Sequence, residues 1–144
     1  MITGATGFTE GAYDKLFYPI GPGGAADLAL RIPRLSKWSY SIGASYHHIL
    51  SDGYLLQMRA DYGYRSRAAY TDNNATFLLP VEYLSAGASA TLLDGHWTFS
   101  VYGHNLLNWV LDGENVPLPA TLGGGSFRTL NKGTVVGGQL SFTY

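Results

Sequence analysis

The sequence has no cysteine, few charged residues and a net charge of only −1. Without cysteine, the chain forms no disulfide bonds, thiolate nucleophiles or cysteine-ligated metal sites. Charged residues are 13% of the chain, where soluble domains usually have ~25%. Because nucleic-acid binding needs Lys and Arg clustered on one face, we expect no nucleic-acid partner.

Long apolar runs are also missing. A membrane-crossing helix needs about 18 consecutive apolar residues, and the most apolar stretch, FLLPV at residues 77–81, contains a proline. Residues 1–8 lack the basic segment and apolar core of a secretory signal peptide. We therefore expect that the protein stays inside the cell or that its beginning is missing. The 144 residues hold one domain at most, or a piece of a larger one.

Aromatic residues and glycine are abundant, and several segments alternate between apolar and polar side chains. Residues 38–50 and 54–66 alternate over their whole length, and a period of two is typical of a β-strand. Shorter or less regular alternation predicts further strands at 82–93, 97–102 and 134–144, and a weaker one at 8–17. The predicted fold is therefore all-β, an antiparallel meander of about six strands.

The predicted connections alternate in length. The long ones have 22, 15 and 27 residues (16–37, 67–81 and 107–133), and the short ones have three and two (51–53 and 94–95). In a meander, every second connection lies at the same end of the sheet. All the tight turns then fall on one rim and all the long loops on the other, as in transmembrane β-barrels.

Strand length and aromatic placement agree with a membrane barrel. A strand of 13 residues, tilted by about 45°, covers about 30 Å of membrane normal. Aromatic residues at or near the strand ends suit the interfacial girdles of such barrels; they are Trp38, Tyr54, Tyr64, Trp97 and Tyr144.

The residues on the two faces of the strands predict which face contacts water and which contacts lipid. In a large membrane barrel the polar face lines a wet lumen, so Arg59, Asp61 and Arg65 are the lumen-facing candidates. A soluble domain would show many Lys and Glu on its outer face, but the predicted strands after Trp38 contain no Lys and only Glu82 as Glu. The small number of charged residues in the strands favours outer-membrane lipid as the partner of the apolar face.

Five elements of the sequence match a known family. They are IPRLSKWS at 32–39, RADYGYRS at 59–66, Asn74 before a strand entry at 80–84, WTFSVYGHNL at 97–106, and a closing aromatic strand that ends in FTY. The chain resembles the C-terminal barrel segment of TonB-dependent outer-membrane receptors from about residue 30 to the end. The most specific element is Tyr-Gly-x-Asn-Leu after Asp-Gly-x-Trp. One departure is LNKG at 130–133, where the family commonly has Pro-Arg.

This resemblance implies a receptor that imports a siderophore, cobalamin or a glycan through a plugged barrel of about 22 strands. The whole chain, 1–144, would be the C-terminal part of that barrel, in the cell outer membrane and without the plug domain. The implied partners are the remaining barrel strands, the plug and, through the missing N-terminal part, TonB. The candidates for ligand contact in an extracellular loop are Arg67, Asp72, Asn73 and Asn74.

The last strand carries a second expected role. Outer-membrane barrels commonly end in an aromatic residue with apolar residues at alternating positions before it, and the assembly machinery reads this strand by strand addition. The matching residues are Val136, Leu140, Phe142 and Tyr144.

Catalytic and metal-binding patterns are weak. His47 and His48 are adjacent and so point to opposite faces of a strand, while His96 and His104 lie near opposite ends of another. No HExxH, Walker or Gly-x-Ser-x-Gly motif is present, and GGG at 123–125 lacks the Lys that phosphate-binding loops need. We expect no metal, no cofactor and no enzymatic activity.

Two other interpretations remain open at this point. A complete small outer-membrane barrel with a structural or adhesive role needs about eight strands, so further strands would have to lie in 21–30 or 116–127. Those segments are rich in Gly and Pro. A soluble lipocalin-like binding protein would instead place the aromatic face around an internal ligand.

Overall fold

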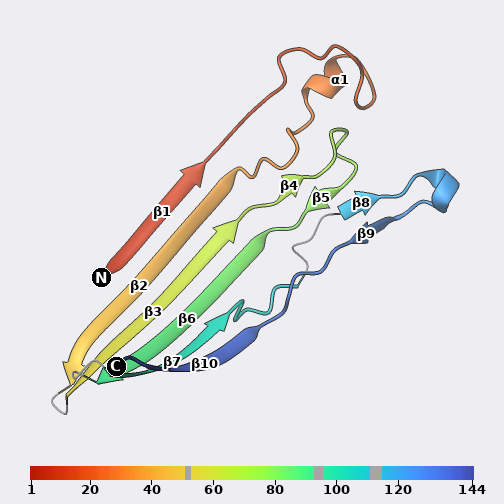
Figure 1. Cartoon of the computed structure of the whole chain (residues 1–144). Helices are drawn as coiled ribbons and strands as arrows, with labels where there is room; N and C mark the ends of the chain where they lie inside the picture. The colour runs from red at the N-terminus through yellow and green to blue at the C-terminus, as the bar shows by residue number, and fades with distance from the viewer. Residues whose placement is uncertain (51–52, 93–95, 111–114) are drawn as a thin grey trace.

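The computed structural model describes residues 1–50, 53–92, 96–110 and 115–144, and one six-stranded antiparallel sheet dominates it (Figure 1). The sheet consists of β1 (Ile2–Phe8), β2 (Trp38–Leu50), β3 (Tyr54–Arg65), β6 (Val81–Leu92), β7 (Trp97–His104) and β10 (Val135–Phe142), in that order. Neighbours in the sheet follow one another in the chain, apart from short elements in the loops. The predicted all-β antiparallel meander of about six strands is confirmed.

The remaining elements are small and gather at one end of the sheet (Figure 1). They are α1 (Ala25–Leu28), the paired strands β4 (Ala68–Ala69) and β5 (Phe77–Leu78), the paired strands β8 (Asn115–Pro117) and β9 (Ser126–Arg128), and a 3-10 turn at Ala120–Leu122. Segments 21–30 and 116–127 therefore add no strand to the main sheet. Within the described ranges, neither helical segment is long and apolar enough to cross a membrane.

The prediction of a strand at 8–17 is wrong, because the first strand is β1 and ends at Phe8. The two faces of its ITGATGF sequence differ little in polarity. Its position is set by pairing with β2, from Ile2 opposite Ala44 to Phe8 opposite Trp38. Past the end of β1, Glu10 forms an ion pair with Lys37.

The other strand limits differ from the prediction by a few residues. β6 starts one residue earlier, β7 continues to His104, and β10 is shorter than 134–144. Of the predicted tight turns, residues 51, 52, 94 and 95 lie outside the described residues. Gly53 is described and has φ 84°, a left-handed conformation that glycine adopts without strain.

The register places apolar side chains from all six strands on one face. Residues directly opposite each other share a face, and one such row crosses the whole sheet: Ile2, Ala44, Ala60, Ala86, Gly103 and Val136. Counting in steps of two from this row defines the apolar face, which includes Ile42, Phe99 and Leu140. The residues between them form the polar face, with Arg59 and Ser100 among them.

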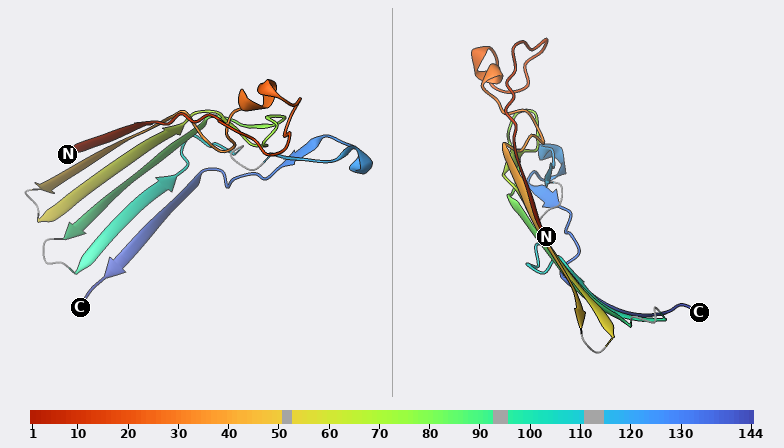
Figure 2. Two further views of the ribbon diagram at one scale, coloured as in Figure 1. Left: turned by 90° about the horizontal axis from the view of Figure 1, so that it is seen from above. Right: turned by 90° about the vertical axis from the view of Figure 1, so that its left-hand side faces the viewer.

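The sheet is a single curved layer when it is viewed edge-on (Figure 2). Among the described residues, the buried apolar side chains are those of Ala68, Ala69 and Val81. On the apolar face, Phe99 is 55% exposed and Leu140 is 66% exposed. Over the described residues the sheet does not close into a barrel, and β1 and β10 are its two edges. The apolar face is therefore left uncovered by this chain.

Candidate functional site

Aromatic rings mark both ends of the apolar face. At the long-loop end, the ring centroids of Phe8 and Trp38 are 4.7 Å apart, and those of Tyr40 and Tyr64 are stacked, also at 4.7 Å. At the tight-turn end, the centroids of Trp97 and Phe142 are 4.7 Å apart. The five girdle candidates divide between these ends, with Trp38 and Tyr64 at the first, and Tyr54, Trp97 and Tyr144 at the second.

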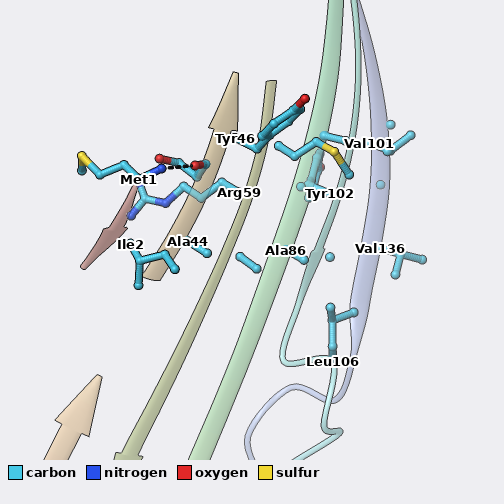
Figure 3. A pocket seen from close by; sticks show the side chains of 18 residues that line it. Met1, Ile2, Ala44, Tyr46, Arg59, Ala86, Val101, Tyr102, Leu106 and Val136 are labelled. Carbon is cyan, nitrogen blue, oxygen red and sulfur yellow. Dashed lines mark hydrogen bonds between the residues drawn. The ribbon is translucent and has the colours of Figure 1, made fainter. Parts of the chain in front are cut away.

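The middle of the apolar face is hollowed because its side chains are short. Figure 3 shows Ala44 and Ala86 between the larger Ile2 and Val136. The hollow has a volume of about 860 Å³ and an almost wholly apolar lining. The apolar face thus combines a hollowed centre of small side chains with aromatic rings at both ends.

The polar face holds the predicted lumen-facing residues. Arg59 and Asp61 are two apart on β3, and two hydrogen bonds join them, from Nε to Oδ2 at 2.6 Å and from Nη2 to Oδ1 at 2.9 Å. Arg65 lies on the same face at the end of β3. A hollow of about 690 Å³ on this face is lined by polar side chains, among them Arg59, Asp61, His47 and Gln57, together with apolar groups of the sheet.

The four histidines are dispersed. His47 lies opposite Gln57 on the polar face, and His48 lies opposite Leu56 on the apolar face. His104 Nδ1 lies 3.4 Å from Ser85 Oγ, and His96 lies beside the chain end. In the part of the chain that the structure describes, no three His, Asp or Glu side chains gather where they could hold a metal.

The terminal strand places the predicted assembly residues together. Val136, Leu140 and Phe142 share the apolar face of β10, and Tyr144 follows two residues later, fully exposed. His96 Nδ1 lies 2.8 Å from the Thr143 carbonyl oxygen, and the Thr143 amide donates to the His96 carbonyl oxygen at 2.8 Å. Because a carbonyl only accepts, Nδ1 carries the proton in this contact. The sequence alone gave no sign of this contact.

Two long loops are tied together at residues 31–34 and 69–74, which we call the loop clasp. The Arg31 amide donates to Asn74 Oδ1 at 2.7 Å, and Asn74 Nδ2 donates to the Arg31 carbonyl oxygen at 2.8 Å. The Arg34 amide donates to the Ala69 carbonyl oxygen at 2.7 Å. Asn74 has φ 56°, which asparagine tolerates better than most residues. The Asn74 side chain therefore holds the loops together.

Asp27 organises the first of these loops. Its side chain is buried, and its two carboxylate oxygens accept from the amides of Ile20 at 2.9 Å and Gly23 at 2.8 Å. The hydrogen bond from Gly23 lowers the pKa of the Asp27 carboxyl below its ordinary value, and burial opposes this shift only in part. The charged form of Asp27 is thus the one that holds residues 20–27 in shape.

The structure at the end of β7 explains the Tyr-Gly-x-Asn-Leu element of residues 102–106. Asn105 has φ 50°, and its side chain accepts from the Trp109 amide and donates to the carbonyl oxygens of Trp109 and Lys132, each at 2.9 Å. A Cβ at Gly103 would lie 2.6 Å from Leu106 Cδ2. The glycine therefore lets Leu106 fold back over the strand, and the asparagine fixes the start of the following loop.

The structure places the four candidates for ligand contact in the loop at three different sites. Asp72 and Asn73 line an open cleft of about 520 Å³, together with Arg34 and Tyr70. Arg67 instead lies over the Phe77 ring, 3.8 Å from its centroid, and Asn74 belongs to the loop clasp.

Comparisons with known proteins add no relative. No family profile, curated protein or solved structure matches this chain.

Proposed function

We propose that this chain is part of the wall of an outer-membrane β-barrel. More specifically, it is the C-terminal barrel segment of a TonB-dependent receptor that takes up a scarce nutrient such as a siderophore, cobalamin or a glycan. The observation that carries this proposal is the uncovered apolar face, which runs across six strands in one register and has aromatic rings at both ends.

The energetics of the apolar face favour lipid as its cover. Burying apolar surface stabilises a protein by about 25 cal/mol per Å², and a single-layer sheet gains little of this from its own side chains. Large side chains on this face, such as Ile42 at 53% exposed, remain open to whatever surrounds the sheet. Hydrocarbon would remove them from water, and the aromatic rings would lie at the two headgroup levels.

The polar face then faces the water-filled interior of the barrel. Arg59 and Asp61 lie near the middle of β3, where a charge on the lipid side would be costly. Their ion pair leaves this part of the wall without net charge. Arg65 lies nearer the long-loop rim on the same side.

The two open edges support the proposal that the wall continues in other strands. In lipid, an unpaired backbone N–H or C=O costs several kcal/mol, and the smallest bacterial barrels have about eight strands. In this proposal the strands that pair with β1 and β10, the plug domain and the TonB-contacting segment all belong to the parent receptor.

Single-cysteine variants at matched positions on the two faces test which face contacts lipid. The chain contains no cysteine, so single spin labels can be placed at Ala88 and Val101 on the apolar face and at Ser89 and Ser100 on the polar face. With the chain in lipid vesicles, we expect the first pair to be relaxed by oxygen, which concentrates in lipid, and the second by a water-soluble nickel complex. The opposite pattern, or recovery of a folded monomer without detergent, would refute the proposal.

A further inference from the structure

We propose that Tyr102 and Gly137 form a register lock, which keeps the terminal strand β10 in one alignment with β7. The two residues lie directly opposite each other and share the polar face of the sheet. A Cβ at Gly137 would lie 2.6 Å from both Cζ and Oη of Tyr102, closer than non-bonded heavy atoms approach. The aromatic ring therefore occupies the space that a side chain at residue 137 would fill.

The sequence of β10 leaves its alignment with β7 open to slippage. Alternation of apolar and polar residues excludes a slip of one position, since that would exchange the two faces, but a slip of two positions keeps every side chain on its face. A tight turn fixes the register of a hairpin, whereas β7 and β10 are joined by the long segment 105–134. The first four residues of β10, VVGG, also show no contrast in polarity.

Gly137 is the one polar-face position of β10, all of whose residues the structure describes, that has no side chain. The others on this face are Val135, Gln139 and Ser141. A slip of two residues would place Val135 or Gln139 opposite Tyr102. The new side chain would then displace the ring, and the contact between the ring and the neighbouring strand would be lost.

The Tyr102 ring is also held from within β7. Its centroid lies 5.5 Å from that of the His104 ring, and His104 Nδ1 in turn lies 3.4 Å from Ser85 Oγ on β6. Tyr102 is 43% exposed, so more than half of it is covered although the sheet is a single layer (Figure 2). An aromatic ring laid over a glycine of the adjacent edge strand is one of the devices that pin strand register.

Contacts at the two ends of β10 agree with the same alignment. At the long-loop end, Thr134 Oγ1 donates to the Asn105 carbonyl oxygen at 2.8 Å. At the tight-turn end, the ring centroids of Trp97 and Phe142 are 4.7 Å apart. Both contacts lie at the margins of the pairing between β7 and β10. The register lock lies inside this pairing and so acts on the body of the strand.

A fixed alignment determines what the outer edge of β10 presents. The Thr143 amide donates to the His96 carbonyl oxygen, so residue 143 bonds towards β7, and the direction alternates along an antiparallel strand. The main-chain groups of residues 136, 138, 140 and 142 therefore point away from β7. In the proposed receptor these groups would pair with the next strand of the wall, and only this last step rests on the proposed function.

Disulfide trapping measures the alignment directly, because the chain contains no cysteine. Three double-cysteine variants of the full chain are folded separately in a mild detergent under oxidising conditions. Ser100→Cys with Gln139→Cys reports the observed alignment, in which these positions lie opposite each other. Ser100→Cys with Ser141→Cys, and Thr98→Cys with Gln139→Cys, report the two slips of two residues. Without a slip, these last pairs are diagonal neighbours about 7–8 Å apart, beyond the usual reach of a disulfide.

Substitutions at the register lock are then added to each double-cysteine variant. Tyr102→Ala and Gly137→Ala should each lower the ratio of the observed-alignment disulfide to the slipped ones by about fivefold, the upper range for a cross-strand side-chain pair. Gly138→Ala is the matched control, since its Cβ would lie 3.5 Å from the Ser100 carbonyl oxygen, an ordinary contact. Tyr102→Phe keeps the ring and should leave the wild-type ratio unchanged.

Three results would overturn the inference: a wild-type ratio in folded Tyr102→Ala or Gly137→Ala, an equal loss in Gly138→Ala, or an equal loss in Tyr102→Phe. Unchanged amide NMR shifts in β3 and β6 show that a variant is folded. If Gly137→Ala does not fold, the comparison of Tyr102→Ala with Tyr102→Phe decides. A slip of two residues keeps both faces, so the spin-label test of the proposed function does not depend on these outcomes.

Discussion

At the scale of single residues, the loops depend on a few polar side chains that bind main-chain atoms. Asp27 is one of them, and its carboxylate holds two amides of the first long loop. Because the pKa of Asp27 is lowered in the folded chain, folding is favoured by its charged form. This contribution is fully present above the ordinary carboxyl pKa of 3.8 and is lost as the pH falls through the lowered value.

We therefore predict that the amide NMR signals of Ile20 and Gly23 stay constant from neutral pH down to the ordinary carboxyl pKa and move only below it. In Asp27→Asn, which has no titrating group at this position, the same signals should show no such transition. A transition at or above the ordinary value in the wild type would contradict the hydrogen-bonding argument.

Asn105 is a second such residue, and it combines three side-chain hydrogen bonds with a left-handed backbone. Asn105→Ala should lower the free energy of unfolding by about 2–3 kcal/mol, because both features are lost. Asn105→Gly should have a smaller effect, since glycine keeps the backbone conformation.

Urea unfolding in lipid vesicles measures these changes. Asn73→Ala is a suitable control, because the structure shows one hydrogen bond from a neighbouring amide to its side chain. An effect of Asn105→Ala no larger than that of Asn73→Ala would refute this role.

At the scale of secondary-structure elements, adjacent positions on one strand should respond in opposite ways to the same substitution. On β6, Ala88 belongs to the apolar face and Ser89 to the polar face, and both have small side chains. Lysine on the lipid side near the bilayer centre costs about 2–4 kcal/mol. We predict this loss of folding free energy for Ala88→Lys and almost none for Ser89→Lys.

Folding into vesicles, followed by tryptophan fluorescence over a urea series, gives both values. Equal losses for the two variants would mean that the faces do not differ in their surroundings.

The terminal strand gives a separate prediction about assembly. Deleting residues 142–144 from the proposed full-length parent should sharply reduce its insertion into the outer membrane, because Phe142 ends β10 and Tyr144 follows it as the terminal aromatic residue. Surface labelling of intact cells measures the inserted protein. Gln139→Ala, on the polar face of the same strand, should leave the level unchanged. Unchanged surface levels after the deletion would count against a role in assembly.

Strands were predictable where their two faces differ in polarity. The alternation in β2, β3 and β6 specifies the strands and the sheet register together, since a slip of one residue would exchange the two faces. β1 was misplaced because Gly4 and Thr6 lie on the apolar face and give no such contrast. Its position follows from main-chain pairing with β2, which leaves no local pattern in the sequence.

The candidate site was predictable only in part for a related reason. Asp72 and Asn73 are polar residues of a long loop, which is why the sequence makes them candidates, and the structure places both on the open cleft. Arg34 and Tyr70 become their neighbours through the loop clasp, which joins segments that no periodicity connects. The role of Asn74 was also hidden, because its partner is the backbone of Arg31.

At the scale of the whole molecule, the open sheet should be protected unevenly against hydrogen exchange. β3 and β6 have neighbours on both sides, whereas β1 and β10 have one each. In the chain alone we predict slow exchange in β3 and β6 and fast exchange at the outward-pointing amides of β1 and β10. In the proposed parent receptor, both edges should become as slow as the centre.

Exchange followed by mass spectrometry on both proteins gives the comparison. Edges that exchange equally fast in the parent would argue against continuation of the wall through further strands.

The loop clasp has a consequence for how such a loop can change over generations. The two hydrogen bonds from the Asn74 side chain to residue 31 are made to its main-chain N–H and C=O, so they do not depend on which side chain stands at that position. Residue 31 can be exchanged for another that fits the same backbone, and the two loops keep their relative placement. The protein can thus alter what it presents at this rim while its scaffold stays the same.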